Sequence, residues 1–364
     1  MLSPKTKNNI SRIIPFGVIW LIFSIVYTQL EKGLLANLKY YPATGNSYNF
    51  SRNIFITPIS ALITGILIGV LEILYFNKLF SHKSFSQKII FKSIIYLITI
   101  LLFLVVLTLI TNSIEMQRSV FSSQVVDALL AFFSRYAVLS VMIYIASIIV
   151  VSQFYSEVSE NIGQSVLNNF FTGKYHTPTV EERIYMFLDM KSSTTIAESL
   201  GHVKYFEMLK DYYADLSEPI IKYTGEIYQY VGDEIVVSWK LKKGLHDNNC
   251  IQCFFAMKTA FRRQTERYSE KFGLLPDFKA GFHLGKVTTG EIGVLKKEII
   301  FTGDVLNTTA RIQGLCNAYK VDILISDDLR KELTPDSKFQ IKTLGENELR
   351  GRNGRIELFT INCL

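Results

Sequence analysis

The chain has 364 residues, a length that accommodates two or three folded units. It carries 39 Lys and Arg against 32 Asp and Glu, but residues 1–155 alone hold 12 basic and 4 acidic side chains, which leaves the remainder close to neutral. Because the basic excess is confined to one half of the chain, the charge does not indicate nucleic-acid binding, and we expect no nucleic-acid partner.

Four long apolar segments dominate the first half, at residues 13–30, 54–76, 89–111 and 136–154. Each is close to the ~20 residues with which a helix crosses the hydrocarbon core of a bilayer. Residues 94–110 contain no charge and no polar face, which argues against the buried core of a soluble helical domain. We therefore expect an α-helical transmembrane bundle in contact with membrane lipid. No small-residue cleavage site follows the first segment, so we do not expect a signal peptide.

The positions of the basic residues predict how this bundle is oriented. Residues 1–12 and the connection 77–92 are rich in Lys and Arg and contain no acidic residue. Basic segments of this kind remain on the cytoplasmic side, so both termini are expected in the cytoplasm of a plasma or inner-membrane protein. The connections 31–53 and 112–135 are then external, and they are too short to form a separate receptor domain.

One acidic residue, Glu72, lies near the end of the second apolar segment. A carboxylate close to a helix end can extend its side chain to the membrane interface, and we expect Glu72 to do so. Contact with a ligand is the alternative.

Residues 152–180 separate the membrane half from the remainder of the chain. Apolar side chains recur in this segment every four residues, as in an amphipathic helix that pairs with its counterpart in a dimer. They are Phe154, Val158, Ile162, Val166 and Phe170. We interpret the segment as a transducer between the membrane and the second half, with an inert spacer as the alternative.

Two aspartates stand at expected strand ends in the second half. Residues 184–189 form an almost wholly apolar run that ends on Asp189, as in a strand buried on both faces. Residues 226–230 and 234–239 are β-rich and enclose a turn that contains Asp233. If this hairpin lies beside the first strand, the two carboxylates converge and can bind a hard divalent cation. Taken singly, either Asp is better explained as a strand end or turn residue.

A third segment, residues 301–313 with the sequence FTGDVLNTTARIQ, is expected to enter a helix at Asp304. Asn307 and Arg311 stand four residues apart, so they share one helical face. An amide and a guanidinium on one face suit the oxygens of a triphosphate. A solvated helix face is the alternative for this pair alone.

Together these segments resemble the catalytic domain of the class III nucleotidyl cyclases, in a membrane-anchored bacterial form. The similarity rests on FLDMKSST, VGDE, FHLGKVTTGEIG and GDVLNTTAR, and it extends over residues 181–364. The order of expected elements also suits an α+β unit of the ferredoxin-like type. We thus divide the chain into a membrane anchor (1–151), a transducer (152–180) and a catalytic domain (181–364).

The resemblance implies roles for individual residues. Asp189 and Asp233 would bind two Mg²⁺ or Mn²⁺ ions per site, Asn307 would position the ribose, and Arg311 would bind phosphate. Arg350 and Arg352 stand where the family has a phosphate-binding Lys, and a guanidinium can replace it. Two such domains would pack head to tail as a homodimer, with the aspartates from one chain and the Asn and Arg from the other in each site.

Two positions depart from the family pattern, and both lie where members of the family read the base of the nucleotide. Gln229 and Ile300 occupy them, where adenylyl and guanylyl cyclases carry other pairs. Ile300 offers no hydrogen bond, whereas the amide of Gln229 can turn to match either purine.

The resulting prediction is an adenylate cyclase that converts ATP into 3′,5′-cyclic AMP and pyrophosphate. Guanylate or dual-specificity cyclase activity, with GTP as a substrate, is one alternative. A membrane receptor that binds nucleotide without turnover is another. A diguanylate cyclase is disfavoured, because that family has no counterpart of the LNTTAR helix.

Overall fold

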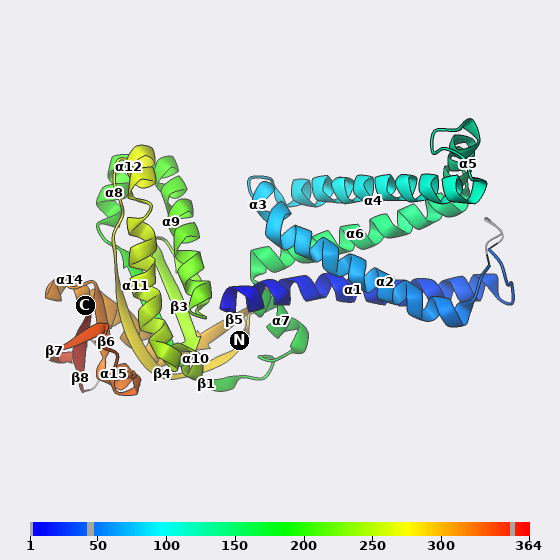
Figure 1. Ribbon diagram of the computed structural model, residues 1–364. Coiled ribbons are helices and arrows are strands. Elements are labelled where there is room, and N and C mark those ends of the chain that lie inside the picture. Colours follow the sequence, from blue (N-terminus) through cyan, green and yellow to red (C-terminus); the bar gives the residue numbers. More distant parts are fainter. Residues whose placement is uncertain (1–2, 42–46, 350–353) are drawn as a thin grey trace. The chain divides into compact units, whose positions relative to one another are not determined.

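The computed structural model describes residues 3–41, 47–349 and 354–364. From Lys7 onward the chain divides into a helical unit, Lys7–Asn168, and an α+β unit that begins at Asn169 (Figure 1). This division falls inside the segment 152–180 that the sequence predicts to be a transducer.

Four helices of the helical unit are long and apolar enough to cross a membrane, which confirms the expected number of long apolar helices. They are α1 (Pro4–Leu35), α2 (Phe50–Leu71) with its continuation, α4 (Phe85–Met116) and α6 (Tyr136–Ile162). The continuation of α2 consists of a π-helical turn, η1 (Glu72–Phe76), and the short α3 (Asn77–Leu79). A further helix, α5 (Ser123–Phe133), lies between α4 and α6. These features indicate a membrane-anchored protein.

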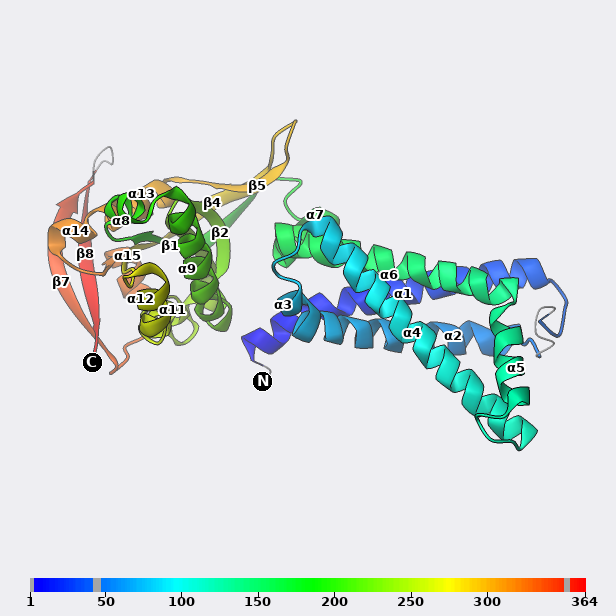
Figure 2. The same cartoon turned by 90° about the horizontal axis from the view of Figure 1, so that it is seen from above.

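The long helices pack around a small apolar core (Figure 2). It includes Phe16 and Trp20 from α1, and residues of α2, α4 and α6. Helices α1 and α2 approach closely at Gly65, where an added Cβ would lie 2.7 Å from the carbonyl oxygen of Phe16. Gly69 makes a similar approach one turn later. Small residues four positions apart are a common basis for close packing of membrane helices.

The prediction that Glu72 extends to the membrane interface is wrong. Its side chain is fully buried, and its carboxylate lies 2.5 Å from the ammonium nitrogen of Lys92 on α4. The sequence indicates a nearby helix end, but it does not reveal the buried cation that makes an inward position favourable.

The segment after α6 is not one continuous helix. Helix α6 ends at Ile162, Gly163 adopts a positive φ of 95°, and α7 (Gln164–Thr172) follows. Phe154 and Ile162 of the expected apolar stripe are exposed in the single chain. Their pairing in a dimer remains a prediction.

The second unit is built on a sheet whose eight described strands follow the order β2-β3-β1-β4-β6-β8-β7, with β5 paired to β4. The strands are β1 (Thr179–Met190), β2 (Glu226–Val231), β3 (Glu234–Lys240), β4 (Phe278–Ile292), β5 (Glu298–Thr302), β6 (Ile323–Ser326), β7 (Phe339–Glu348) and β8 (Arg355–Cys363). The helices are α8 (Ser193–Leu200), α9 (His202–Lys222), α10 (Leu241–Leu245), the 3₁₀ turn η2 (His246–Asn248), α11 (Asn249–Arg262), α12 (Thr265–Phe272), α13 (Asp304–Gly314), α14 (Cys316–Tyr319) and α15 (Asp327–Glu332). The predicted α+β class is confirmed.

Strand β1 is buried on both faces, as its apolar sequence predicts. Ile184, Met186 and Leu188 face a core formed with α9 and α11, which lie along the sheet in Figure 1. Tyr185 and Phe187 face the other side, where Val305 of α13 packs. Because side chains alternate along a strand, Asp189 continues the α13-facing row.

Candidate active site

Asp189 and Asp233 lie together at the end of β1. Strand β3 pairs antiparallel with β1 up to Leu188 opposite Ile235, which brings the β2–β3 turn beside Asp189. Gly232 in this turn has a φ of 64°, a left-handed conformation that glycine adopts without strain. The prediction that the hairpin brings the two carboxylates together is therefore confirmed.

The electrostatics of this pair suit a bound cation. Burial, and then the close approach of Asp233, raise the pKa of Asp189 above its ordinary value, while Lys279 lowers it. Asp233 Oδ2 is buried and accepts no hydrogen bond from the described part of the chain. A divalent ion would satisfy this oxygen and remove the repulsion between the carboxylates, so the residues present fit such an ion. No cluster of three or more metal-ligating side chains occurs among the described residues, so other ligands would have to come from substrate, water or backbone.

Two further side chains contact Asp189, and the sequence analysis missed both. Lys279 Nζ lies 3.5 Å from Asp189 Oδ2, and Gln313 Nε2 donates a hydrogen bond of 3.2 Å to the same oxygen. Lys279 is directly opposite Asp189 in the β1–β4 register. Its isolated charge in the apolar run FKAGF is the signal that could have identified it.

Helix α13 carries Gln313 against the sheet because Gly281 of β4 has no side chain. A Cβ on Gly281 would lie 2.3 Å from the backbone nitrogen of Gln313. Asn307 and Arg311 occupy the same helix, as predicted. Asn307 is exposed, and Arg311 Nη1 is buried without a hydrogen-bond partner among the described residues.

The aspartate pair and the Asn–Arg pair make no direct polar contact with each other among the described residues. Neither Asn307 nor Arg311 hydrogen-bonds or ion-pairs with Asp189 or Asp233 in the described residues.

The two expected base-reading positions lie on strands β2 and β5, which are not paired with each other in the sheet. Gln229 is an exposed residue of β2, next to a β-bulge, and Ile300 is a half-buried residue of β5. Their chain neighbours Tyr228 and Phe301 are in contact, with ring centroids 4.9 Å apart. Arg350 and Arg352 lie outside the described residues, so their predicted contact with phosphate remains a prediction.

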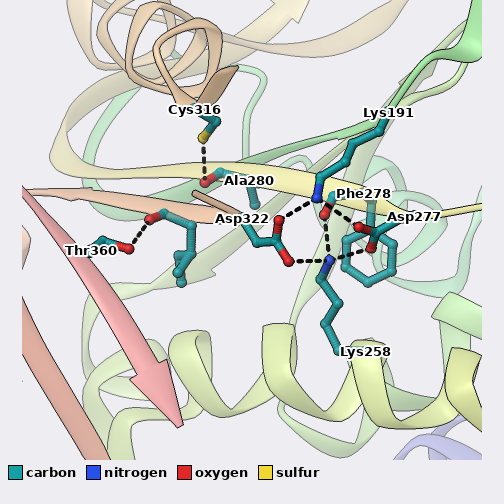
Figure 3. Close-up of polar contacts among 9 residues, drawn as sticks. Lys191, Lys258, Asp277, Phe278, Ala280, Cys316, Asp322 and Thr360 are labelled. Carbon is teal, nitrogen blue, oxygen red and sulfur yellow. Dashed lines mark hydrogen bonds and ion pairs between the residues drawn. The ribbon is translucent and has the colours of Figure 1, made fainter. Parts of the chain in front are cut away.

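An ion-pair cluster of two lysines and two aspartates lies just after the end of β1 (Figure 3). Lys191 and Lys258 each bind both Asp277 and Asp322, with a Lys191–Asp277 distance of 2.7 Å and a Lys258–Asp322 distance of 2.8 Å. Burial alone would raise the pKa of Asp277, but hydrogen bonds from the two lysines outweigh it and lower that pKa. Since Lys191 follows Asp189 by two residues, the cluster fixes the end of β1.

Comparison with known proteins identifies related sequences. Residues 176–363 match the family described as the adenylate and guanylate cyclase catalytic domain. "Adenylate cyclase 2" of Rhizobium meliloti (strain 1021) is 34% identical over 210 residues, which cover 58% of this chain and 58% of that protein. "Adenylate cyclase 1" of the same strain is 25% identical over 187 residues, or 50% of this chain and 27% of that protein. This chain thus spans less than two thirds of either relative.

One solved structure shares the fold. The structure of a bacterial light-regulated adenylyl cyclase superposes with a TM-score of 0.53 and 19% identity, covering 63% of this chain and 66% of the other. At this level of identity the likeness concerns the fold alone.

Proposed function

The chain belongs to the adenylate and guanylate cyclase catalytic-domain family, and on that premise we propose that it is a membrane-anchored adenylate cyclase. It would convert ATP into 3′,5′-cyclic AMP and pyrophosphate. The observation that carries this proposal is the Asp189–Asp233 pair, with its unsatisfied buried oxygen and the raised pKa of Asp189. Residues 1–151 would form the anchor, 152–180 the transducer and 181–364 the catalytic domain.

Each site residue has a task in this reaction. Two Mg²⁺ or Mn²⁺ ions held by Asp189 and Asp233 would supply activation of the ribose 3′-hydroxyl and charge neutralisation at the phosphates. Asn307 would hold the ribose by a hydrogen bond, and Arg311 would pair with phosphate oxygens as they gain charge. Lys279 offsets part of the negative charge of Asp189, whose Oδ2 is 3.5 Å from its ammonium nitrogen. The reaction needs no covalent protein nucleophile.

A head-to-tail homodimer would complete the site. Within one chain the aspartates contact Lys279 and Gln313 but not Asn307 or Arg311. A two-fold axis that brings α13 of one chain to β1 of the other would build two equivalent sites. Such an arrangement would let both pairs act in one reaction.

ATP is the proposed substrate, and Gln229 leaves GTP open as the alternative. Gln229 is exposed and has a rotatable amide, so it can present a donor or an acceptor to the base. Ile300 supplies only apolar contact. The basic residues at the N terminus and in the 77–92 connection support a cytoplasmic position for the catalytic domain, where nucleoside triphosphates occur.

The decisive experiment is incubation of the purified full-length protein with Mn²⁺ and either ATP or GTP, followed by identification of the product. Cyclic AMP formation, absent in Asp233→Asn, is the expected result. Nucleotide binding without a cyclic product would instead favour a non-catalytic receptor. Predominant cyclic GMP would reassign the substrate.

A further inference from the structure

Helix α6 buries a polar face inside the helical unit. Its buried residues near the α7 end are all polar, whereas the apolar Phe154 and Ile162 are exposed. The buried polar residues are Ser152, Gln153, Ser156, Glu157 and Ser159. This inverted pattern suits a helix whose outer surface meets lipid, but it places a charged carboxylate, Glu157, among other helices.

Lys92 neutralises that carboxylate and joins three helical segments. Its ammonium group donates to Glu157 Oε1 on α6 at 2.8 Å, to Glu72 Oε1 on η1 at 2.5 Å, and to Asn77 Oδ1 on α3 at 3.0 Å. The side chains of Lys92, Glu72 and Glu157 are all completely buried. A lysine has three N–H donors, so this geometry uses every one. Tyr96 completes the cluster by donating to Glu72 Oε2 at 2.9 Å.

The π-helical turn η1 brings two of these acceptors together. Glu72 and Asn77 are five residues apart, which would place them about 140° apart around an α-helix. Here the backbone N–H of Asn77 donates to the carbonyl of Glu72, an i to i+5 bond that returns the chain to the same side after one turn. Both side chains consequently reach Lys92.

The cluster extends to the N-terminal helix through partly buried partners. Lys88 lies 3.3 Å from Glu157 Oε2 and 3.7 Å from Glu160. Arg12 of α1 lies 3.8 Å from Glu160. The last turns of α6 are therefore held by charges on α1, η1 and α4.

Helix α6 carries a second possible acceptor for Lys92, one turn before Glu157. Gln153 is completely buried, and neither of its amide atoms has a hydrogen-bond partner among the described residues. It precedes Glu157 by four residues, so both occupy the same face of α6. If α6 moved along its axis by one turn, about 5.4 Å, the amide oxygen of Gln153 would replace the Glu157 carboxylate beside Lys92.

We propose that Lys92, Glu72 and Glu157 form an interhelical latch that holds α6 in one of two axial positions and thereby sets the rate of the catalytic unit. Buried ion pairs contribute little to stability relative to apolar packing, and in some proteins buried polar groups instead select one arrangement of the helices, the role that we assign to them here. Helix α6 leads through α7 into the catalytic unit, and Gln164 at the start of α7 hydrogen-bonds Ser159 and Tyr155 of α6 across Gly163. A movement of α6 is thus passed on past the helix break. The rate part of the inference rests on the proposed function.

An exchange variant tests the latch without changing composition or charge. Gln153→Glu combined with Glu157→Gln moves the carboxylate one turn along α6, so the alternative position should become the favoured one. Spin labels at Leu67→Cys on α2 and Val150→Cys on α6, both exposed positions, report the axial position by pulsed EPR on the full-length chain in lipid vesicles. Cys363→Ser removes the one exposed native thiol among the described residues.

We expect the label distance to change by ~2 Å or more and the rate of cyclic nucleotide formation to change at least ~5-fold. Lys78→Met, which alters an exposed lysine outside the cluster, should leave both unchanged. An unchanged distance refutes the latch, and a changed distance with an unchanged rate refutes its coupling to catalysis. If the exchange variant does not fold, Glu157→Gln alone, which keeps the Lys92–Glu72 pair, gives the same two readouts. A wild-type chain without cyclase activity refutes the proposed function, while the distance still decides the latch.

Discussion

Replacement of Gly281 by Ala should displace the helix that carries Asn307 and Arg311. The new Cβ would lie 2.3 Å from the backbone nitrogen of Gln313 and 2.6 Å from its Cα, and backbone atoms cannot rotate away. Ordinary contact begins at 3.4 Å, so α13 must move outward by about 1 Å. Such a misplacement of catalytic groups lowers turnover by ~100-fold.

The same substitution should destabilise the catalytic unit moderately. Overpacking of a buried site costs about 1–3 kcal/mol, which lowers the Tm of a unit of this size by roughly 2–12 °C. The assay is kcat/KM for ATP with Mn²⁺, together with thermal unfolding. Gly314→Ala is the matched control, because Gly314 ends the same helix and an added Cβ there meets nothing within 4 Å. A Gly281→Ala protein with wild-type kcat/KM would refute the placement of α13 as a determinant of activity.

Further predictions follow from the site. Asp189→Asn should reduce turnover at saturating Mn²⁺ to less than about a tenth, since the loss of a metal ligand exceeds 1.4 kcal/mol in the transition state; a smaller loss in a steady-state assay would contradict its role. In the metal-free protein, Asp189→Asn should raise the Tm at pH 7 and leave it nearly unchanged at pH 3. The pKa of Asp189 is raised in the folded protein, so ionisation of this carboxyl destabilises the fold once the pH exceeds the ordinary pKa of an aspartate. An equal Tm for both proteins at pH 7 would show that the folded protein does not disfavour the ionised carboxylate. Asp189→Asn and Arg311→Ala chains, each inactive alone, should regain part of the activity when mixed, because a heterodimer contains one intact site; no recovery after verified subunit exchange would argue for sites within one chain. Gln229→Lys with Ile300→Asp should increase the ratio of kcat/KM for ATP over GTP from a wild-type value within ~100, and an unchanged ratio would show that these positions do not read the base.

The sequence predicts the carboxylate pair because local rules suffice for it. An apolar strand that ends on Asp189 and a hairpin with Asp233 in its turn need only pair side by side, and the structure confirms that they do. Lys279 and Gln313 escaped prediction because their contacts depend on the β1–β4 register and on the position of α13, which no local pattern specifies.

In the membrane half, the sequence predicts the long helices but not their interior. Apolar length identifies the four helices, whereas the inward position of Glu72 depends on a π-helical turn and on Lys92, 20 residues away. The repeat through 152–180 likewise continues across Gly163, although a positive φ there ends α6. Hydrophobic periodicity thus does not reveal where polar groups meet inside a bundle.

Strand β4 has a consequence for the order in which the catalytic unit opens. It pairs with β1 without interruption from Phe278 to Thr289, and just beyond, the N–H of Glu291 donates to the carbonyl of Tyr175 in the segment that follows α7. Lys279 and Glu291 are twelve residues apart, about 40 Å along an extended strand. The amide protons of the buried part of β4, Phe278–His283, should exchange with solvent deuterium last, and those of the half-exposed part toward Glu291 earlier. The chain that arrives from the helical unit is therefore joined to the earlier-opening end of β4, whereas the buried far end of this strand holds the charge opposite Asp189.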